Sequence, residues 1–244
     1  IGEIKIENVS GKSLEDIKVS VYVKNFMIGK TESLQKMPVL KEHNRATLSL
    51  YAYFDKNIKY LNADTNTSGL IEIEYKNFNG QKFSMKKTFQ IQILNKNSIN
   101  WSNMSQIGSF ITFEDKPVIE FARKAVQLAK NQNSLPENIS QALKIFQMLK
   151  SYGLKYVPDP KGSYRSAFDD STQIDWVQFP RETLIKKTGN CDDFSVLFAS
   201  LLESVGILTA IVAVPEHVFM LFETRHKIPG KTVFFEGKNW VPIE

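Results

Sequence analysis

The hydrophobic period of the chain changes near residue 100, and this change constrains the possible folds more than any other feature. Before it, apolar residues alternate with polar ones, as at Ile17, Val19, Val21 and Val23. Such alternation is typical of strands that bury one face. After an Asn-rich stretch at residues 95–103, apolar residues recur with a period of 3.6, which indicates amphipathic helices. The sequence therefore predicts two domains, residues 1–98 and residues 99–244.

The first domain is expected to be entirely β. The alternating pattern recurs in three more runs, at residues 48–54, 71–75 and 89–93. Asn79-Gly80 separates two of these runs and predicts a two-residue hairpin turn, because both residues tolerate positive φ. Several short strands with turn signals and no helical pattern favour a two-sheet sandwich of immunoglobulin-like or fibronectin-like architecture.

The second domain is expected to contain three helices followed by strands. Asp115 and Pro117 are typical of a helix start, and Gly153 is typical of a helix end. A third helix with a wide apolar face opens at or just after Cys191 and stops at Gly206. The β-rich runs that follow are residues 207–214, 217–224, 232–236 and 240–244. Helices followed by strands predict an α+β fold with a small antiparallel sheet.

Composition narrows the function classes. Lys and Arg number 31 against 26 Asp and Glu, and this modest excess forms no dense basic stripe, so we expect no nucleic-acid partner. With one cysteine, an intramolecular disulfide and a CxxC metal site are excluded. The chain lacks an apolar run of about 18 residues, so we expect no membrane span. It begins with Ile1 and ends after a strand-like run, so we expect it to be part of a longer protein, with a signal peptide allowed before it.

Cys191 is the central functional candidate. It follows Gly189-Asn190 at the predicted start of the apolar helix. Unpaired N–H groups at a helix N-terminus stabilise a thiolate, so we expect a lowered thiol pKa, and the same groups can form part of an oxyanion hole. The alternative is a buried, inert cysteine, which is a common state for this residue type.

His217 is the candidate base, because it opens a predicted strand and can point towards the helix tip. A base needs an orienting acceptor. Glu244 follows on a later strand and is the first candidate for that acceptor, with Glu236 as the alternative. His43 and His226 are interpreted as surface residues. Asp192 and Asp193 are interpreted as charges that compensate the helix N-terminus.

Taken together, these motifs resemble those of the bacterial transglutaminase-like (papain-related) cysteine enzymes. The resemblance covers roughly residues 100–244 and rests on the segments at residues 189–193, 202–207, 214–219 and 240–244. It implies a papain/transglutaminase-like α+β fold in which Cys191 is the nucleophile, His217 the base and Glu244 the third member of the triad. Where this family has Asp in its W-x-P-x-D element, the chain has Glu244.

The resemblance also implies an upstream side chain that completes the oxyanion hole, for which Gln178 and Trp176 are the candidates. The first domain is similar to the β-sandwich modules that accompany such enzymes in exported bacterial proteins, which implies a periplasmic, cell-surface or secreted location.

The first functional hypothesis is therefore a cofactor-independent acyl-transfer enzyme. Its thiolate would attack a peptide or glutamine amide, and water or an amine would resolve the acyl-enzyme. Hydrolysis by a cysteine peptidase or amidase is favoured over cross-linking by a transglutaminase. A second hypothesis is a catalytically silent transglutaminase-like module that binds a protein or a cell-wall component. A third is an accessory segment of a larger surface protein whose activity lies elsewhere.

Overall fold

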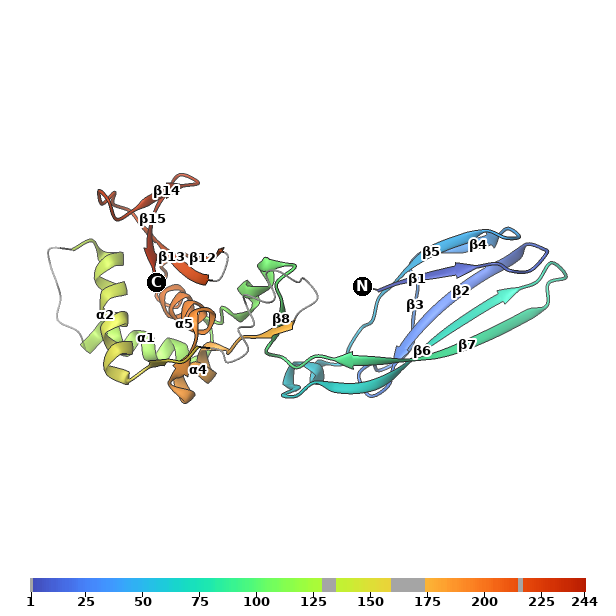
Figure 1. The fold of residues 1–244 in the computed structure, drawn as a ribbon, viewed down its shortest axis with the longest axis horizontal. Helices are drawn as coiled ribbons and strands as arrows, with labels where there is room; N and C mark the ends of the chain where they lie inside the picture. Colours follow the sequence, from blue (N-terminus) through green and yellow to red (C-terminus); the bar gives the residue numbers. More distant parts are fainter. Residues whose placement is uncertain (1, 129–134, 159–173, 215–216) are drawn as a thin grey trace. The chain divides into compact units, whose positions relative to one another are not determined.

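The computed structural model describes residues 2–128, 135–158, 174–214 and 217–244 of the chain. The chain divides into two compact units, residues 1–96 and residues 97–244 (Figure 1). The division after Lys96 falls close to the boundary expected after residue 98.

The first unit is built from strands and one short 3-10 helix. In chain order these are β1 (Gly2–Glu7), β2 (Leu14–Val23), β3 (Thr31–Glu32), β4 (Met37–Leu40), β5 (Arg45–Leu50), η1 (Lys56–Tyr60), β6 (Thr65–Lys76) and β7 (Lys82–Ile93). Five of the strands form an antiparallel sheet in the order β3-β2-β6-β7, in which β4 also pairs with β2. The other two, β1 and β5, form a two-stranded antiparallel ladder.

The core of this unit follows the alternation in the sequence. On β2 the buried side chains are Ile17, Val19, Val21 and Val23. They belong to one apolar cluster with Leu48 and Leu50 of β5. Along β7, by contrast, residues 82–88 are exposed on both faces of the strand. Alternation thus predicts the buried face of a strand correctly where a second layer covers it.

The β6–β7 connection is longer than the two residues predicted at Asn79-Gly80. Asn77 N donates to Gln81 O at 2.9 Å, so the loop is closed outside the predicted pair. Only Gly80 of that pair has a positive φ, of 77°. A loop of this length needs just one residue in the left-handed region, which is the position that glycine occupies.

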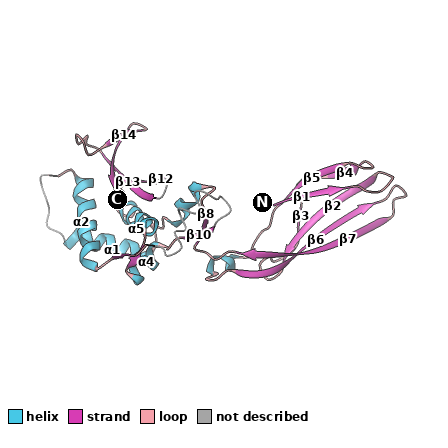
Figure 2. Cartoon of the chain, viewed as in Figure 1, coloured by secondary structure: helices cyan, strands magenta, loops and turns pink. Residues whose placement is uncertain are grey.

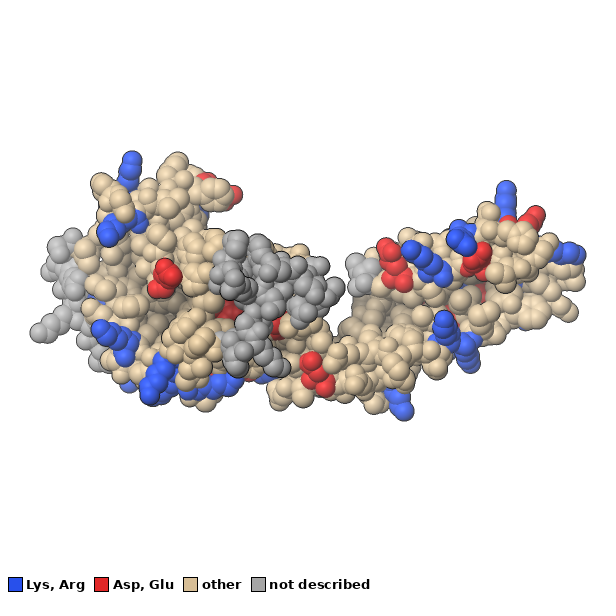
Figure 3. Space-filling model, in the orientation of Figure 1, with Lys and Arg blue, Asp and Glu red and all other residues tan. Residues whose placement is uncertain are grey.

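Charged side chains pair across the sheet of this unit. Glu72 contacts Lys30 and, at 3.3 Å, Lys86. The hydrogen bond from Lys30 is the main reason that the pKa of Glu72 is lowered to about 2. On the face of this unit drawn in Figure 3, positive side chains lie beside negative ones.

The second unit begins with β8 (Ser98–Asn100) and η2 (Met104–Phe110). Its helices are α1 (Lys116–Leu128), α2 (Glu137–Tyr152), α4 (Pro180–Lys186) and α5 (Cys191–Glu203). Short strands lie between them, namely β9 (Lys155–Tyr156), β10 (Ile174–Trp176) and β11 (Thr188–Gly189). The chain then forms β12 (Thr209–Val214), β13 (His217–Thr224), β14 (Val233–Phe235) and β15 (Lys238–Ile243). Figure 2 distinguishes these helices and strands by colour.

Three small sheets organise the strands of this unit. The largest is antiparallel, with the order β12-β13-β15-β14. The others are the antiparallel pair β8-β10 and the parallel pair β9-β11. Helix α5 is central: Leu197, Leu201 and Leu202 are almost fully buried and belong to one core cluster with α1, α2 and β13. The predicted helix signals are confirmed at Cys191, where α5 starts, and at Gly153, which caps α2 with a φ of 86°.

The predicted fold class, an immunoglobulin-like sandwich followed by a papain/transglutaminase-like fold, is wrong. Over the described residues the structure is mixed α/β, with 40% strand and 27% helix, in several small sheets of which one is curled into a half-barrel. In the first unit the layer opposite the five-stranded sheet is only the β1–β5 ladder. Hydrophobic alternation indicates which face of a strand is buried, but strand partners depend on contacts between residues far apart in the sequence.

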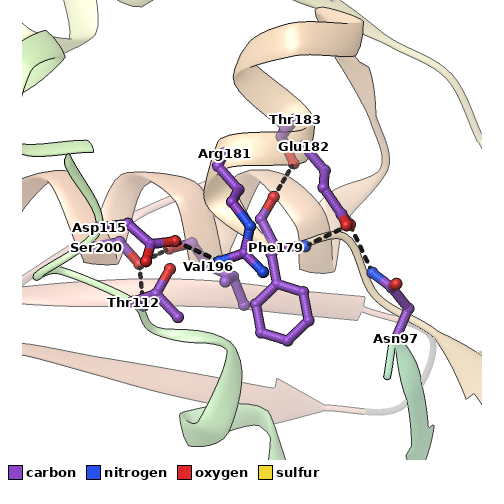
Figure 4. A network of polar contacts seen from close by, with 9 residues as sticks. All are labelled: Asn97, Thr112, Asp115, Phe179, Arg181, Glu182, Thr183, Val196 and Ser200. Carbon is purple, nitrogen blue, oxygen red and sulfur yellow. Dashed lines mark hydrogen bonds and ion pairs between the residues drawn. The ribbon is translucent and has the colours of Figure 1, made fainter. Parts of the chain in front are cut away.

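A polar network braces α4 and α5 against the segment that enters the second unit (Figure 4). Arg181 donates to Asp115 Oδ2 at 2.5 Å, and Ser200 Oγ accepts from Thr112 N at 3.1 Å. Asn97 Nδ2 donates to Glu182 Oε2 at 2.6 Å. These contacts join the segments around Asn97 and residues 112–115 to α4 and α5.

Within the described ranges, each helix is too short or too polar to cross a bilayer.

Candidate active site

A cavity of about 580 Å³ opens in the second unit beside the start of α5. Its wall is formed by α2, α5, β13, the segment around β9, and the end of β15. The residues that line it are Phe146, Leu149, Lys150, Leu154, Tyr156, Cys191, Phe194, Ser195, Leu197, Phe198, His217, Val218, Met220, Ile243 and Glu244. The structure thus places all three predicted triad residues on the wall of one cavity.

Cys191 is the first residue of α5, and the residues around it explain why the helix begins there. Asn190 is the N-cap, and its side chain accepts from Asp193 N at 3.2 Å. Asp193 Oδ2 in turn accepts from Asn190 N at 3.2 Å, which completes a reciprocal capping box. The first intrahelical bond runs from Phe194 N to Asn190 O. The N–H groups of Cys191 and Asp192 therefore precede the hydrogen-bonded turns of the helix.

His217 and Glu244 are brought together by the register of β13 and β15. Met220 pairs with Ile243, so Glu244 at the end of β15 is a diagonal neighbour of His217. Glu244 Oε1 lies 3.3 Å from His217 Nε2. The two groups are not aligned for a hydrogen bond, and Nε2 is buried without a hydrogen-bond partner. The Glu244 side chain is 83% exposed, whereas that of His217 is 33% exposed.

The thiol and the imidazole share the cavity without a direct bond. In the part of the chain that the structure describes, Cys191 Sγ makes no hydrogen bond with the His217 ring. The ring instead stacks on Phe219, with a centroid distance of 6.2 Å. The stacking is expected because residues i and i+2 of a strand point to the same face. The structure therefore shows a thiol and an imidazole on the wall of one cavity, without a hydrogen bond between them.

The expected lowering of the thiol pKa is wrong. Burial is the main cause that raises the pKa of the Cys191 thiol, and the charge of Asp192 raises it further. Hydrogen bonding from the backbone of Val218, Asp192 and Cys191 itself acts in the opposite direction but does not outweigh burial. The helix N-terminus does stabilise the thiolate, yet removal of the sulfur from water costs more. At rest the site thus holds a neutral thiol.

Asp192 is more deeply placed than a helix-compensating charge would be. Its side chain is fully buried, and the pKa of its carboxyl is raised well above the usual value, first by burial and then by the charges of Asp193 and Asp175. Oδ1 accepts from Asp193 N at 2.8 Å, whereas Oδ2 is buried without a hydrogen-bond partner. Asp175 in turn accepts from Trp101 Nε1 at 2.8 Å. Burial thus makes the charged form of Asp192 costly, and the charge that it carries when ionised opposes the thiolate of Cys191.

The pH dependence of Cys191 alkylation tests this electrostatic arrangement. We expect the rate of reaction with iodoacetamide to rise with pH, with a midpoint above that of the same thiol in the urea-unfolded chain. The Asp192→Asn variant should move the midpoint of the folded chain downward, because it removes a negative charge that opposes the thiolate. Intact-mass spectrometry measures the rate at a single site, since the chain has one cysteine. A midpoint below that of the unfolded chain would contradict this description.

The two predicted oxyanion-hole residues have other contacts and do not line the cavity. Gln178 Nε2 donates to Asp193 Oδ2 at 2.7 Å and to Thr188 O at 3.1 Å, and Gln178 N donates to Asp193 Oδ1 at 2.7 Å. Trp176 packs against the Lys186 ammonium, which lies 4.4 Å from its ring centroid. Gln178 thus holds the helix start in place through Asp193.

Gly189 shows how tightly this start is packed. A Cβ at that position would lie 2.8 Å from Asp193 Cβ and 3.1 Å from the Phe194 ring. Glycine is therefore required at position 189 because Asp193 and Phe194 leave no room for a side chain. Backbone conformation is not the reason, since φ of Gly189 is not positive.

The remaining candidates lie away from the cavity. Glu236, the alternative acceptor, is exposed in the turn between β14 and β15 with a φ of 49°. His43 and His226 are exposed. Within the described ranges, no group of three His, Cys, Asp or Glu side chains is placed to hold a metal ion.

No protein-family model matches the chain, and comparison with curated proteins gives no match either.

Proposed function

We propose that the chain is a cysteine-dependent acyl-transfer enzyme that hydrolyses a peptide or side-chain amide. One observation carries the proposal: a thiol at the first position of α5 and an imidazole beside a carboxylate line the same cavity. The order of the motifs, which resembles that of transglutaminase-like enzymes, supports the same assignment. Hydrolysis is proposed over cross-linking, and a peptide or protein is the proposed substrate.

The mechanism starts from the neutral thiol. His217 accepts the proton of Cys191 Sγ as sulfur attacks the carbonyl carbon. The N–H groups of Cys191 and Asp192 stabilise the resulting oxyanion. The imidazolium then returns the proton to the leaving amine, and the C–N bond breaks to leave a thioester. In the second half, His217 takes a proton from water as the hydroxide adds to the thioester carbon. The C–S bond then breaks, and the imidazolium returns its proton to the departing sulfur, which releases the acid and restores the thiol.

The open geometry between thiol and imidazole is compatible with this sequence. Catalytic hydrogen bonds are often long in the absence of substrate and shorten when substrate binds. Glu244 beside Nε2 stabilises the positive charge that the ring gains on accepting the thiol proton. Gln178 acts through Asp193 as a positioning residue rather than as a direct donor.

A catalytically silent binding module is the second candidate. The raised pKa of the Cys191 thiol and its lack of a bond to the imidazole favour this reading. Both observations also describe a resting thiol that ionises only during attack, so turnover decides between the two.

Acyl-enzyme trapping is the test. With p-nitrophenyl butyrate, the enzyme proposal expects a burst of nitrophenolate and a butyryl mass increment on Cys191. His217→Ala should slow the burst by about 10²–10⁴-fold, since that is the usual contribution of a general base. His226→Ala is the matched control, because that histidine is exposed and does not line the cavity. Equal burst rates in the native chain and His217→Ala would show an isolated thiol and favour the silent module.

A further inference from the structure

The cavity beside Cys191 has an apolar interior that the chemistry of acyl transfer does not itself require. Its floor consists of side chains that are almost completely buried and yet border the empty space, namely Leu149, Leu197, Phe198, Val218 and Met220. Buried side chains normally contact one another without gaps. Part of the wall of this cavity of about 580 Å³ is therefore formed by core side chains of the unit.

The charged groups lie at the rim. Lys150 on α2 is exposed, and the Glu244 side chain is 83% exposed, so the polar ends of both side chains reach solvent. Phe146 and Tyr156 are 49% and 59% exposed and form the apolar part of the same rim. A polar or charged group at the floor would find no hydrogen-bonding side chain among the five floor residues, and burial of such a group without a partner is unfavourable.

The position of the sulfur connects this space to the reaction. Cys191 lines the cavity, so the substituents of the carbonyl carbon bonded to its sulfur must lie within a few bond lengths of the wall. Ser195, one turn further along α5, also faces the cavity, but its hydroxyl donates to Cys191 O at 2.7 Å and lies 3.3 Å from Val218 O. The hydroxyl is thus engaged in holding the helix to β13 and offers little to a polar substrate group.

We infer that the acyl group transferred by this site carries a bulky apolar substituent that occupies the cavity, rather than the short polar chain of glutamine. This inference rests on the proposed function. At roughly 30 Å³ for each water-sized group, the space holds on the order of ten to twenty non-hydrogen atoms, which suits an aromatic or branched aliphatic side chain with its neighbouring atoms. Contact between the apolar substituent and the floor of the cavity provides the binding energy. The amide itself then lies near the rim, next to the sulfur.

Alkylation rates test this inference without requiring turnover. At pH 9, the rate at which N-benzyl iodoacetamide alkylates Cys191 is divided by the rate for iodoacetamide. This ratio is then divided by the same ratio measured with glutathione, which gives a corrected ratio that removes the intrinsic difference between the reagents. We expect a corrected ratio of at least about ten, because the cavity removes the benzyl group from water near the sulfur. Phe146→Ala should reduce the corrected ratio several-fold, and Leu154→Trp, which fills the space, should bring it close to one.

Phe113→Ala is the matched control, since Phe113 has a similar exposure of 40% and does not line the cavity. It should leave the corrected ratio unchanged. A corrected ratio near one in the native chain, with Cys191 still reactive towards iodoacetamide, overturns the inference, as does an equal effect of Phe113→Ala and Phe146→Ala.

A binding measurement separates failure of the inference from failure of the proposed function. In the Cys191→Ala chain, which has no nucleophile, 4-phenylbutanamide should bind at least tenfold more tightly than butanamide by calorimetry, with a negative heat-capacity change. If this preference holds and no acyl-enzyme forms in the native chain, the apolar site stands and the enzyme proposal falls. If an acyl-enzyme forms without the preference, the enzyme proposal stands and the apolar site falls.

Discussion

The Cys191→Ala variant is expected to lose acyl transfer by about 10⁶-fold, the loss seen when the nucleophile of a catalytic triad is removed. The loss follows because no other thiol exists in the chain to form the thioester. Steady-state hydrolysis of a peptide amide by the native and variant chains measures it. The cavity wall keeps its shape in the variant, since alanine retains the Cβ of Cys191.

A folding control keeps this result interpretable. All three tryptophans, Trp101, Trp176 and Trp240, lie in the second unit, so their fluorescence follows the unfolding of that unit in the full chain. The Cys191→Ala chain should unfold in urea within about 1 kcal/mol of the native chain, because only one partly exposed sulfur is removed. Activity of the variant within tenfold of native would place the nucleophile elsewhere and end the proposal.

The Asp193→Ala variant is expected to lose about 3 kcal/mol of stability in the second unit. Its carboxylate accepts from Gln178 N, Gln178 Nε2 and Asn190 N, and the substitution leaves these donors without that acceptor. Each orphaned buried donor costs about 1–3 kcal/mol. The sum is reduced because burial raises the pKa of Asp193, which shows that its charge is itself costly to bury.

Urea unfolding followed by tryptophan fluorescence measures the Asp193→Ala effect in the full chain. Asp193→Asn keeps one acceptor oxygen and should lose less than the alanine variant. Asp115→Ala provides a comparison on the same unit, because Asp115 is paired with Arg181 in a partly exposed position. Equal losses in Asp193→Ala and Asp115→Ala would show that the carboxylate at the helix start has no special structural role.

Local features of the second unit were predictable from the sequence because they depend on neighbours along the chain. The start of α5 at Cys191 and its end before Gly206 follow from the apolar face and the Gly-Asn approach. Gly153 caps α2 for the same kind of local reason. The relation of His217 to Glu244 also follows the order of the motifs, since adjacent antiparallel strands bring the start of one beside the end of the other.

Features that depend on distant contacts were not predictable. The sandwich prediction failed because alternation on β2 and β7 looks alike in sequence, although most of β7 is exposed. The thiol pKa was predicted in the wrong direction because the helix N-terminus can be read from the sequence while the burial of Cys191 cannot. The link from Gln178 to Asp193 joins segments whose approach no local pattern indicates.

The sequence carries one signal of the cavity, at Phe146. Phe146 lies with Leu149 on the apolar face of α2, yet it is 49% exposed at the rim of the cavity. A large aromatic residue on a core stripe that remains half exposed marks a place where the packing is incomplete. The sequence alone does not give the exposure of this residue, because the exposure depends on which elements face α2.

The pairing of His217 with a strongly exposed glutamate has a consequence for how the site responds to its medium. One end of this contact is open to bulk solvent, so dissolved ions screen the attraction between the Glu244 carboxylate and the imidazolium that forms in the proposed proton transfer, and this attraction weakens as the Debye length shortens. Burial, the main cause that raises the pKa of the Cys191 thiol, is not screened by dissolved ions. Ionic strength is therefore expected to act on the two halves of the site unequally, weakening the stabilisation of the imidazolium more than it changes the ionisation of the thiol.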